Sequence, residues 1–206
     1  MLECLKRDDS KPTNDIGSHG EGESFKPKWG YIVPHTKKAG GAETPKQKPN
    51  GELIPNAHRF SEYQYGKVIA ITNGEFIPWD DRNHGGVKAA SQRLVANGCN
   101  SLFEDHKNAY RGFTRGAEIL VIRGDELSIK YAEFILEEFK KQFPDHPIRG
   151  IKQMKKGGRG YANLVAMKRG GADVALLGEM FFIDNVKDWI EPEVYAKFLV
   201  RVIGNV

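Results

Sequence analysis

The chain lacks the features that mark membrane-spanning and secreted proteins. Its 206 residues include two cysteines, Cys4 and Cys99, whose separation fits neither a metal-binding nor a redox motif. We interpret Cys99, at the start of an apolar segment, as a buried thiol outside any disulfide. No stretch approaches the ~20 apolar residues that span a bilayer, and the start, MLECLKRDDS, has no apolar signal-peptide core. These absences predict a protein that is synthesised in the cytoplasm without a signal peptide and does not insert into membranes.

A strong excess of charge of one sign is also absent. Lysine and arginine (31) exceed aspartate and glutamate (27) by a net charge of +4, which suits a polyanionic surface such as a cell wall or a nucleic acid and proves neither. The basic runs KKGGRG and MKRGG are short and carry no interleaved aromatic residues. No G-x-x-x-x-G-K-[ST] loop is present either. We therefore expect no nucleic-acid partner.

What is present is the pattern of one α/β domain. Residues 1–28 are polar and predict an N-terminal arm, whereas residues 29–206 suffice for one domain. Strand and helix patterns alternate there, which predicts a single α/β domain with a twisted mixed or mostly parallel sheet of about six strands flanked by helices. The expected strands are Trp29–His35, Cys99–His106, Ala117–Arg123 and Asp173–Asn185, and the expected helices are Val87–Asn97, Leu127–Phe143, Tyr161–Lys168 and Val194–Ile203, with another after the capping box Ser61–Gln64. Residues 152–160 are expected to form a loop.

One apolar run, Asp173–Asn185, has a single carboxylate, Glu179, at its centre. Glycines precede the run and Asp-Asn ends it, so it predicts a central strand that is buried on both faces. An unpaired buried carboxylate destabilises a fold by several kcal/mol. Glu179 therefore requires a cationic partner or a chemical role, and a nearby metal ion would supply both.

Two histidines stand at the ends of predicted strands. His35 lies where the first strand enters a long loop, a common place for ligands in α/β sheets, although it could equally cap the strand. His106 ends the second strand, and the alternation of strand residues places it on the same face as Glu104. A carboxylate beside an imidazole can hold the ring in its metal-binding tautomer. The alternative for His106 is an ordinary edge histidine.

Two imidazoles and a carboxylate are a ligand set for catalytic zinc. We predict that His35, His106 and Glu62 bind Zn²⁺, although Glu62 in the first turn of a helix could simply oppose the helix dipole. Glu179 would take a proton from the zinc-bound water, because zinc lowers the pKa of that water to about 7. No H-E-x-x-H motif supports this set, so it depends on the positions of the residues at strand ends.

Two segments carry a resemblance to a known family. FEDHKNAYRGFTRGAEILV contains a strand that ends in His-x-Asn, a glycine-rich turn and a Gly-x-Glu strand. RGIK and LLGEMFFIDN look like the family segments Arg-Gly-Val-Lys and Leu-x-Glu-x-Gly-Phe-Ile-x-Asn. With the order of elements over roughly residues 29 to 204, the chain resembles the zinc-dependent N-acetylmuramoyl-L-alanine amidases, α/β enzymes of bacterial autolysins and phage lysins.

The resemblance implies a role for each candidate residue. It assigns zinc binding to His35, Glu62 and His106. It assigns the catalytic role to Glu179 and substrate binding to Arg149 and Asn108. The loop before Glu62 is longer than in the family, so Glu43 and Glu52 remain alternatives for that ligand. Arg149 could contact a substrate carboxylate or support a loop. The chain also departs from the family where Met-Phe replaces Gly-Phe after Glu179, and where Pro-His-Thr-Lys-Lys-Ala-Gly-Gly replaces Gly-His-Gly-Gly.

The resemblance also implies a function. The expected enzyme is a monomeric, bacteriolytic peptidoglycan hydrolase that cleaves the amide bond between N-acetylmuramic acid and L-alanine in the cell wall. Without an export signal or a wall-binding repeat, a phage endolysin is expected rather than a secreted autolysin, with a component of a tailed phage particle as the alternative. The alternatives are a zinc peptidase or deacylase with another substrate, and a non-catalytic module that binds the cell wall or a nucleic acid.

Overall fold

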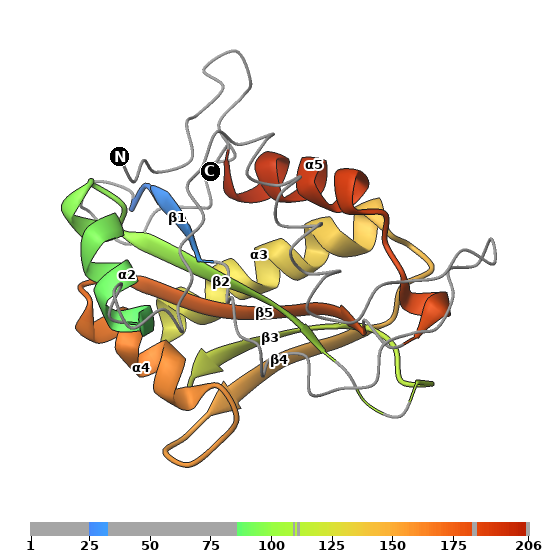
Figure 1. Ribbon diagram of the computed structural model, residues 1–206, viewed down its shortest axis with the longest axis horizontal. Helices are drawn as coiled ribbons and strands as arrows, with labels where there is room; N and C mark the ends of the chain where they lie inside the picture. The colour runs from blue at the N-terminus through green and yellow to red at the C-terminus, as the bar shows by residue number, and fades with distance from the viewer. Residues whose placement is uncertain (1–24, 33–85, 109, 111, 183–184, 205–206) are drawn as a thin grey trace.

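A mixed five-stranded sheet forms the centre of the described part of the chain. The computed structural model describes residues 25–32, 86–108, 110, 112–182 and 185–204 (Figure 1). The strands are β1 (Trp29–Ile32), β2 (Ser101–Asn108), β3 (Ala117–Ile122), β4 (Ile148–Met154) and β5 (Val174–Phe182). Their order is β1-β2-β5-β3-β4, and all neighbours are parallel except β3 and β5. The prediction of a mixed, mostly parallel sheet is therefore confirmed.

The run around Glu179 forms the middle strand of this sheet. β5 lies between β2 and β3, and all of its residues are buried. Gly178 is required because a Cβ there would lie 2.3 Å from Cζ of Phe103 on β2. The prediction of a central strand buried on both faces is confirmed.

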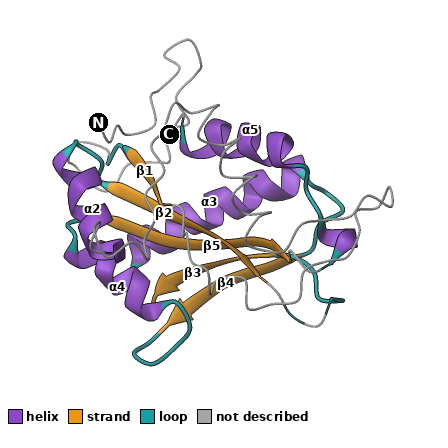
Figure 2. Cartoon of the chain, viewed as in Figure 1, coloured by secondary structure: helices purple, strands orange, loops and turns teal. Residues whose placement is uncertain are grey.

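Helices cover both faces of the sheet (Figures 1 and 2). α2 (Gly86–Ala96) and α4 (Tyr161–Arg169) lie on one face, and α3 (Glu126–Gln142) and α5 (Pro192–Ile203) lie on the other. α3 begins where the Asp125 carboxylate accepts a hydrogen bond from the backbone N–H of Ser128 at 3.3 Å. Within the described residues, no helix has the length and apolarity to cross a membrane.

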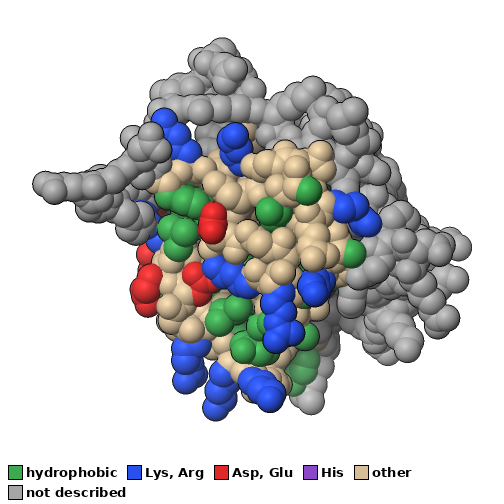
Figure 3. All heavy atoms as spheres, turned by 90° about the vertical axis from the view of Figure 1, so that its left-hand side faces the viewer, with side chains coloured by type: hydrophobic (Ala, Val, Ile, Leu, Met, Phe, Trp, Pro, Cys, Tyr) green, Lys and Arg blue, Asp and Glu red, His purple; other side chains and the backbone are tan. Residues whose placement is uncertain are grey.

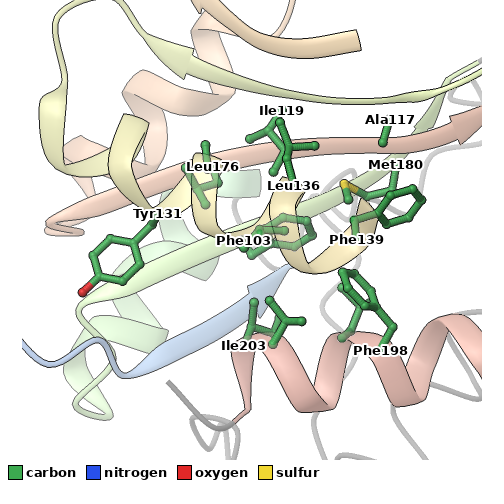
Figure 4. Packing of buried hydrophobic residues seen from close by; sticks show 14 of the residues in the cluster. Phe103, Ala117, Ile119, Tyr131, Leu136, Phe139, Leu176, Met180, Phe198 and Ile203 are labelled. Atoms are coloured by element: carbon green, nitrogen blue, oxygen red, sulfur yellow. The ribbon is translucent and has the colours of Figure 1, made fainter. Parts of the chain in front are cut away.

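The larger hydrophobic core lies between the sheet and the α3–α5 layer. Figure 4 shows Met180 of the sheet close to Phe139 of α3 and Phe198 of α5. The rings of Phe139 and Phe198 meet edge to face, with centroids 5.4 Å apart. A smaller core lies under α2 and α4, and it includes Leu120 and Leu177. The functional cluster described below borders this smaller core.

Two predictions about local structure are wrong. Residues Lys152–Met154 belong to β4 rather than to a loop. β4 is an edge strand with partly exposed residues, so no apolar run signals it. Cys99 is buried as expected, but it takes part in a disulfide, because distance along the sequence does not restrict which cysteines meet in space.

Candidate functional site

A row of ionisable residues crosses three neighbouring strands, β2, β5 and β3, at the end of the sheet where β2 and β5 finish and β3 begins. His106 of β2 pairs in register with Glu179 of β5, and Glu179 pairs with Glu118 of β3. Because β3 runs antiparallel to β5, its amino end meets the carboxyl ends of β2 and β5. The topology therefore gathers three side chains from distant parts of the sequence.

Glu179 is held by two donors. Its Oε2 accepts a hydrogen bond from Nδ2 of Asn108 at 2.8 Å and lies 2.8 Å from Nη1 of Arg159. The residue is 8% exposed, so the carboxylate lies at the border between the core and solvent. The two contacts fix its orientation there. A charged guanidinium at this distance also offsets much of the cost of burying the carboxylate.

Glu118 is a second, fully buried carboxylate beside Glu179. It accepts hydrogen bonds from Nε of Arg149 at 2.9 Å and from Nδ2 of Asn108 at 3.1 Å, and it also pairs with Arg159. Two arginines thus neutralise two adjacent carboxylates. Asn108 bridges both acids, so the cluster is one connected network.

The contacts in this network shift the pKa values of the two glutamates in opposite directions. Burial raises the pKa of Glu179 to about 7; the charge of Arg159 opposes this rise, whereas the hydrogen bond and charge of Glu118 add to it. Burial also acts to raise the pKa of Glu118, but its hydrogen bonds to Arg159 and Arg149 outweigh burial and lower it. Glu179 can therefore both accept and release a proton near neutral pH.

Arg159 reaches this cluster from the loop between β4 and α4. The loop lies directly on the sheet at Gly160, where a Cβ would lie 2.9 Å from Cδ2 of Leu120. Gly160 also has φ 68°, a conformation that glycine adopts without strain. The glycines in this segment thus bring Arg159 to Glu118 and Glu179, while its side chain remains half exposed.

His106 borders the same cluster and is bound by Glu104. Its Nε2 lies 2.9 Å from Oε1 of Glu104, and Nδ2 of Asn163 on α4 donates to that oxygen at 2.9 Å. Burial acts to lower the pKa of His106, but the charge and hydrogen bond of Glu104, with smaller effects of Glu179 and Asp105, raise it above its ordinary value. Glu104 and His106 thus lie on the same face of β2, as the alternation of strand residues predicts.

The structure brings together the predicted residues His106, Asn108, Arg149 and Glu179. The other predicted zinc ligands, His35 and Glu62, and the alternatives Glu43 and Glu52 lie outside the described residues. Arg149 and Asn108 both hydrogen-bond to Glu118, and the Arg149 guanidinium also lies 5.1 Å from the centroid of the Phe182 ring.

The donor types near His106 suit a zinc ion. In the part of the chain that the structure describes, no group of three or more histidine, cysteine, aspartate or glutamate side chains is arranged to hold a metal. An imidazole and carboxylates are nevertheless zinc donors. In addition, Oε2 of Glu104 is buried without a hydrogen-bond partner among the described residues. The described residues thus fit one side of a metal site.

Sequence reasoning missed the functional positions of Glu118, Arg159 and Asn163. Glu118 stands in the Gly-x-Glu segment that supports the family resemblance, so a signal for it existed. Arg159 lies in a basic loop and Asn163 in a short helix, and nothing in their local sequence indicates contacts with strands over forty residues away.

A separate cavity of about 540 Å³ lies beside this loop, lined by Lys156, Gly157, Gly158, Tyr161, Ala162, Val165 and Arg169. None of these residues belongs to the cluster. Lysine and arginine side chains also gather in the lower part of the face shown in Figure 3. This part of the surface is therefore basic.

The fold is that of the N-acetylmuramoyl-L-alanine amidases. No family model matches the chain, and no curated protein matches it in sequence, but solved structures do match. The catalytic domain of the CD27L endolysin targeting Clostridia difficile is 19% identical, with TM-score 0.53 over 85% of this chain and 97% of that one. The catalytic domain of CwlV, an N-acetylmuramoyl-L-alanine amidase from Bacillus (Paenibacillus) polymyxa var. colistinus, is 16% identical, with TM-score 0.53 over 84% and 94%. The amidase AmiC2 of Nostoc punctiforme is 12% identical, with TM-score 0.52 over 84% and 93%.

Proposed function

We propose that this protein is a zinc-dependent N-acetylmuramoyl-L-alanine amidase of the phage endolysin type. The observation that carries the proposal is the cluster of Glu179, Glu118 and His106 at the edge of a sheet with the amidase fold. The substrate is peptidoglycan, and the bond cleaved is the amide between N-acetylmuramic acid and L-alanine. The likeness to an endolysin catalytic domain supports the phage assignment.

In this proposal His106, His35 and Glu62 would hold the zinc ion, with Glu43 and Glu52 as alternatives to Glu62. When bound, zinc would lower the pKa of a water molecule and polarise the scissile carbonyl. His106 would contribute an imidazole near the carboxyl end of β2.

Glu179 moves the proton. Its carboxylate takes a proton from the attacking water as the new C–O bond forms, and returns it to the alanine nitrogen as the C–N bond breaks. A pKa of about 7 suits both steps, because the group must be a base first and an acid afterwards. Asn108 and Arg159 hold the carboxylate in a single orientation during both transfers.

We also assign Arg149 and Asn108 to substrate binding. The Arg149 side chain is 36% exposed while its Nε binds Glu118, so its guanidinium can bind a carboxylate of the stem peptide. Asn108 donates to both acids, so its assignment to substrate binding rests on its place beside Glu179. We expect the enzyme to act as a monomer on the cell wall.

The experiment compares Glu179→Gln with wild type on purified cell walls. Glu179→Gln keeps the size of the side chain and removes the proton acceptor, so we expect digestion to fall by 10²-fold or more, of the order that general-base catalysis contributes, with bound zinc unchanged. Glu133→Gln, an exposed change on α3, is the control. Undiminished digestion by Glu179→Gln would refute the mechanism.

Product analysis separates the amidase from the alternatives. An amidase frees alanine amino groups and leaves intact glycan strands. New amino termini of other residues would instead identify a peptidase or deacylase. Salt-sensitive wall binding without products or zinc would identify a non-catalytic module.

A further inference from the structure

Glu104 is a buried carboxylate to which the proposed reaction gives no task. It is 0% exposed and lies two residues before His106 on β2. Its Oε1 lies 2.9 Å from Nε2 of His106, and the Asn163 amide donates to the same oxygen at 2.9 Å. Glu104 therefore connects β2 to the first turn of α4 through a single oxygen atom.

This contact determines which ring nitrogen of His106 carries the proton. An ionised carboxylate can only accept hydrogen bonds, so Nε2 must be the donor. A neutral imidazole has one N–H, and therefore its lone pair lies on Nδ1. Because a metal binds the nitrogen that has the lone pair, only Nδ1 of His106 is available to a cation.

We propose that Glu104, braced by Asn163, is a positioning residue that holds His106 in its Nε2–H tautomer and directs Nδ1 toward the metal. The tautomer follows from the contacts of an ionised Glu104, whereas the direction toward the metal rests on the proposed function. A carboxylate behind a ligating histidine also increases the basicity of the ring toward the metal.

A purely structural role does not account for Glu104. Its Oε2 is buried without a hydrogen-bond partner among the described residues, and such an oxygen destabilises the fold. An apolar side chain of similar size would avoid that cost. The carboxylate is therefore better explained by what it does to His106 than by what it adds to folding.

The first test is the tautomer in the metal-free protein, read from the ¹⁵N shifts and two-bond couplings of the histidine rings at alkaline pH. We expect Nε2–H for His106 in wild type and in Glu104→Gln, which keeps an acceptor oxygen. Glu104→Met removes the acceptor, so the ring should become a mixture of both tautomers. His146, whose Nε2 faces the backbone oxygen of Asp188 at 3.3 Å, is the reference in the same spectrum. An Nδ1–H tautomer in wild type overturns the proposal.

The second test is a zinc titration of the same samples. Zinc should shift the Nδ1 signal of His106 and leave the Nε2–H coupling in place. A zinc shift at Nε2 would overturn our assignment and leave the ligand role of His106 intact. No shift at either nitrogen would overturn that ligand role, and with it both the zinc-directed half of this proposal and the proposed function.

Zinc affinity gives a readout that does not depend on activity. Competition with a chromogenic chelator should show about 10- to 100-fold weaker binding for Glu104→Met, a smaller loss for Asn163→Ala, and nearly wild-type binding for Glu104→Gln. Arg169→Ala, an exposed change on the same helix as Asn163, is the matched control. Wild-type affinity and tautomer in Glu104→Met would overturn the role of Glu104, and the His146 signals report whether that variant is folded.

Discussion

Glu179 has an arginine on one side and a carboxylate on the other, and these neighbours act on its proton in opposite directions. In the proposed mechanism Glu179 is the general base and must be ionised, so kcat/KM should rise with pH through about 7. Arg159 favours the ionised form, so Arg159→Gln should move this rise to higher pH, by about one pH unit or more for a charge this close. Glu118 favours the protonated form, so Glu118→Gln should move it to lower pH. The pH dependence of wall digestion measures both shifts.

The two variants are expected to shift the pH profile in opposite directions, which distinguishes a change in the pKa of Glu179 from a general loss of structure. A general loss of structure would lower activity at every pH without displacing the profile. Shifts of the same sign in both variants would mean that another group controls the rise. Thermal unfolding of each variant confirms that the compared proteins are folded.

At the scale of the element, β5 depends on the absence of a side chain at Gly178. A methyl group there would meet the rigid Phe103 ring at 2.3 Å, so Gly178→Ala should lower the free energy of unfolding by about 1–3 kcal/mol. Gly30→Ala is the matched comparison, because its new Cβ would meet the flexible end of Leu102 at 2.7 Å, and it should cost less. Denaturant unfolding measures both, and an equal or larger loss in Gly30→Ala would contradict the role of the ring.

The opposite face of β2 carries a buried ion pair. Lys107 Nζ lies 2.6 Å from Oδ1 of Asp105, and Tyr31 and Tyr195 also donate to this carboxylate. Lys107→Met would remove the cation that lies 2.6 Å from the buried Asp105 and should destabilise the protein by about 3–5 kcal/mol. Unfolding in denaturant measures this loss. Activity per folded molecule should change little, since Lys107 points away from Glu179; a large fall would show that the two faces are coupled.

The site residues that could be predicted from sequence are those that interrupt or end a recognisable strand pattern. Glu179 interrupts an apolar run and His106 ends an alternating strand, so both were predictable from their own segments. Glu118 became a neighbour of Glu179 through the antiparallel register of β3 and β5, which no local pattern encodes. Arg159 depends on a loop that returns over the sheet at Gly160. Tertiary register and close backbone approach thus account for what sequence reasoning missed.

At the scale of the whole molecule, the net charge of +4 predicts how the proposed amidase would bind cell walls. Cell walls are polyanionic, and screening by salt weakens attraction between exposed charges. Raising the salt concentration from about 0.05 M to about 0.5 M, which shortens the screening length to a few ångströms, should therefore raise KM for intact walls several-fold and leave kcat nearly unchanged.

The charges expected to produce this salt effect lie outside the cluster of Glu179, Glu118 and His106. Lys156 and Arg169 line the cavity beside the β4–α4 loop and do not belong to the cluster, so the double change to glutamine should reduce the salt dependence of KM and preserve kcat. A short soluble muropeptide should show little salt dependence with either protein. Equal salt dependence for the muropeptide and the wall would place the effect at the cluster itself, where Arg149 and Arg159 are the exposed cations.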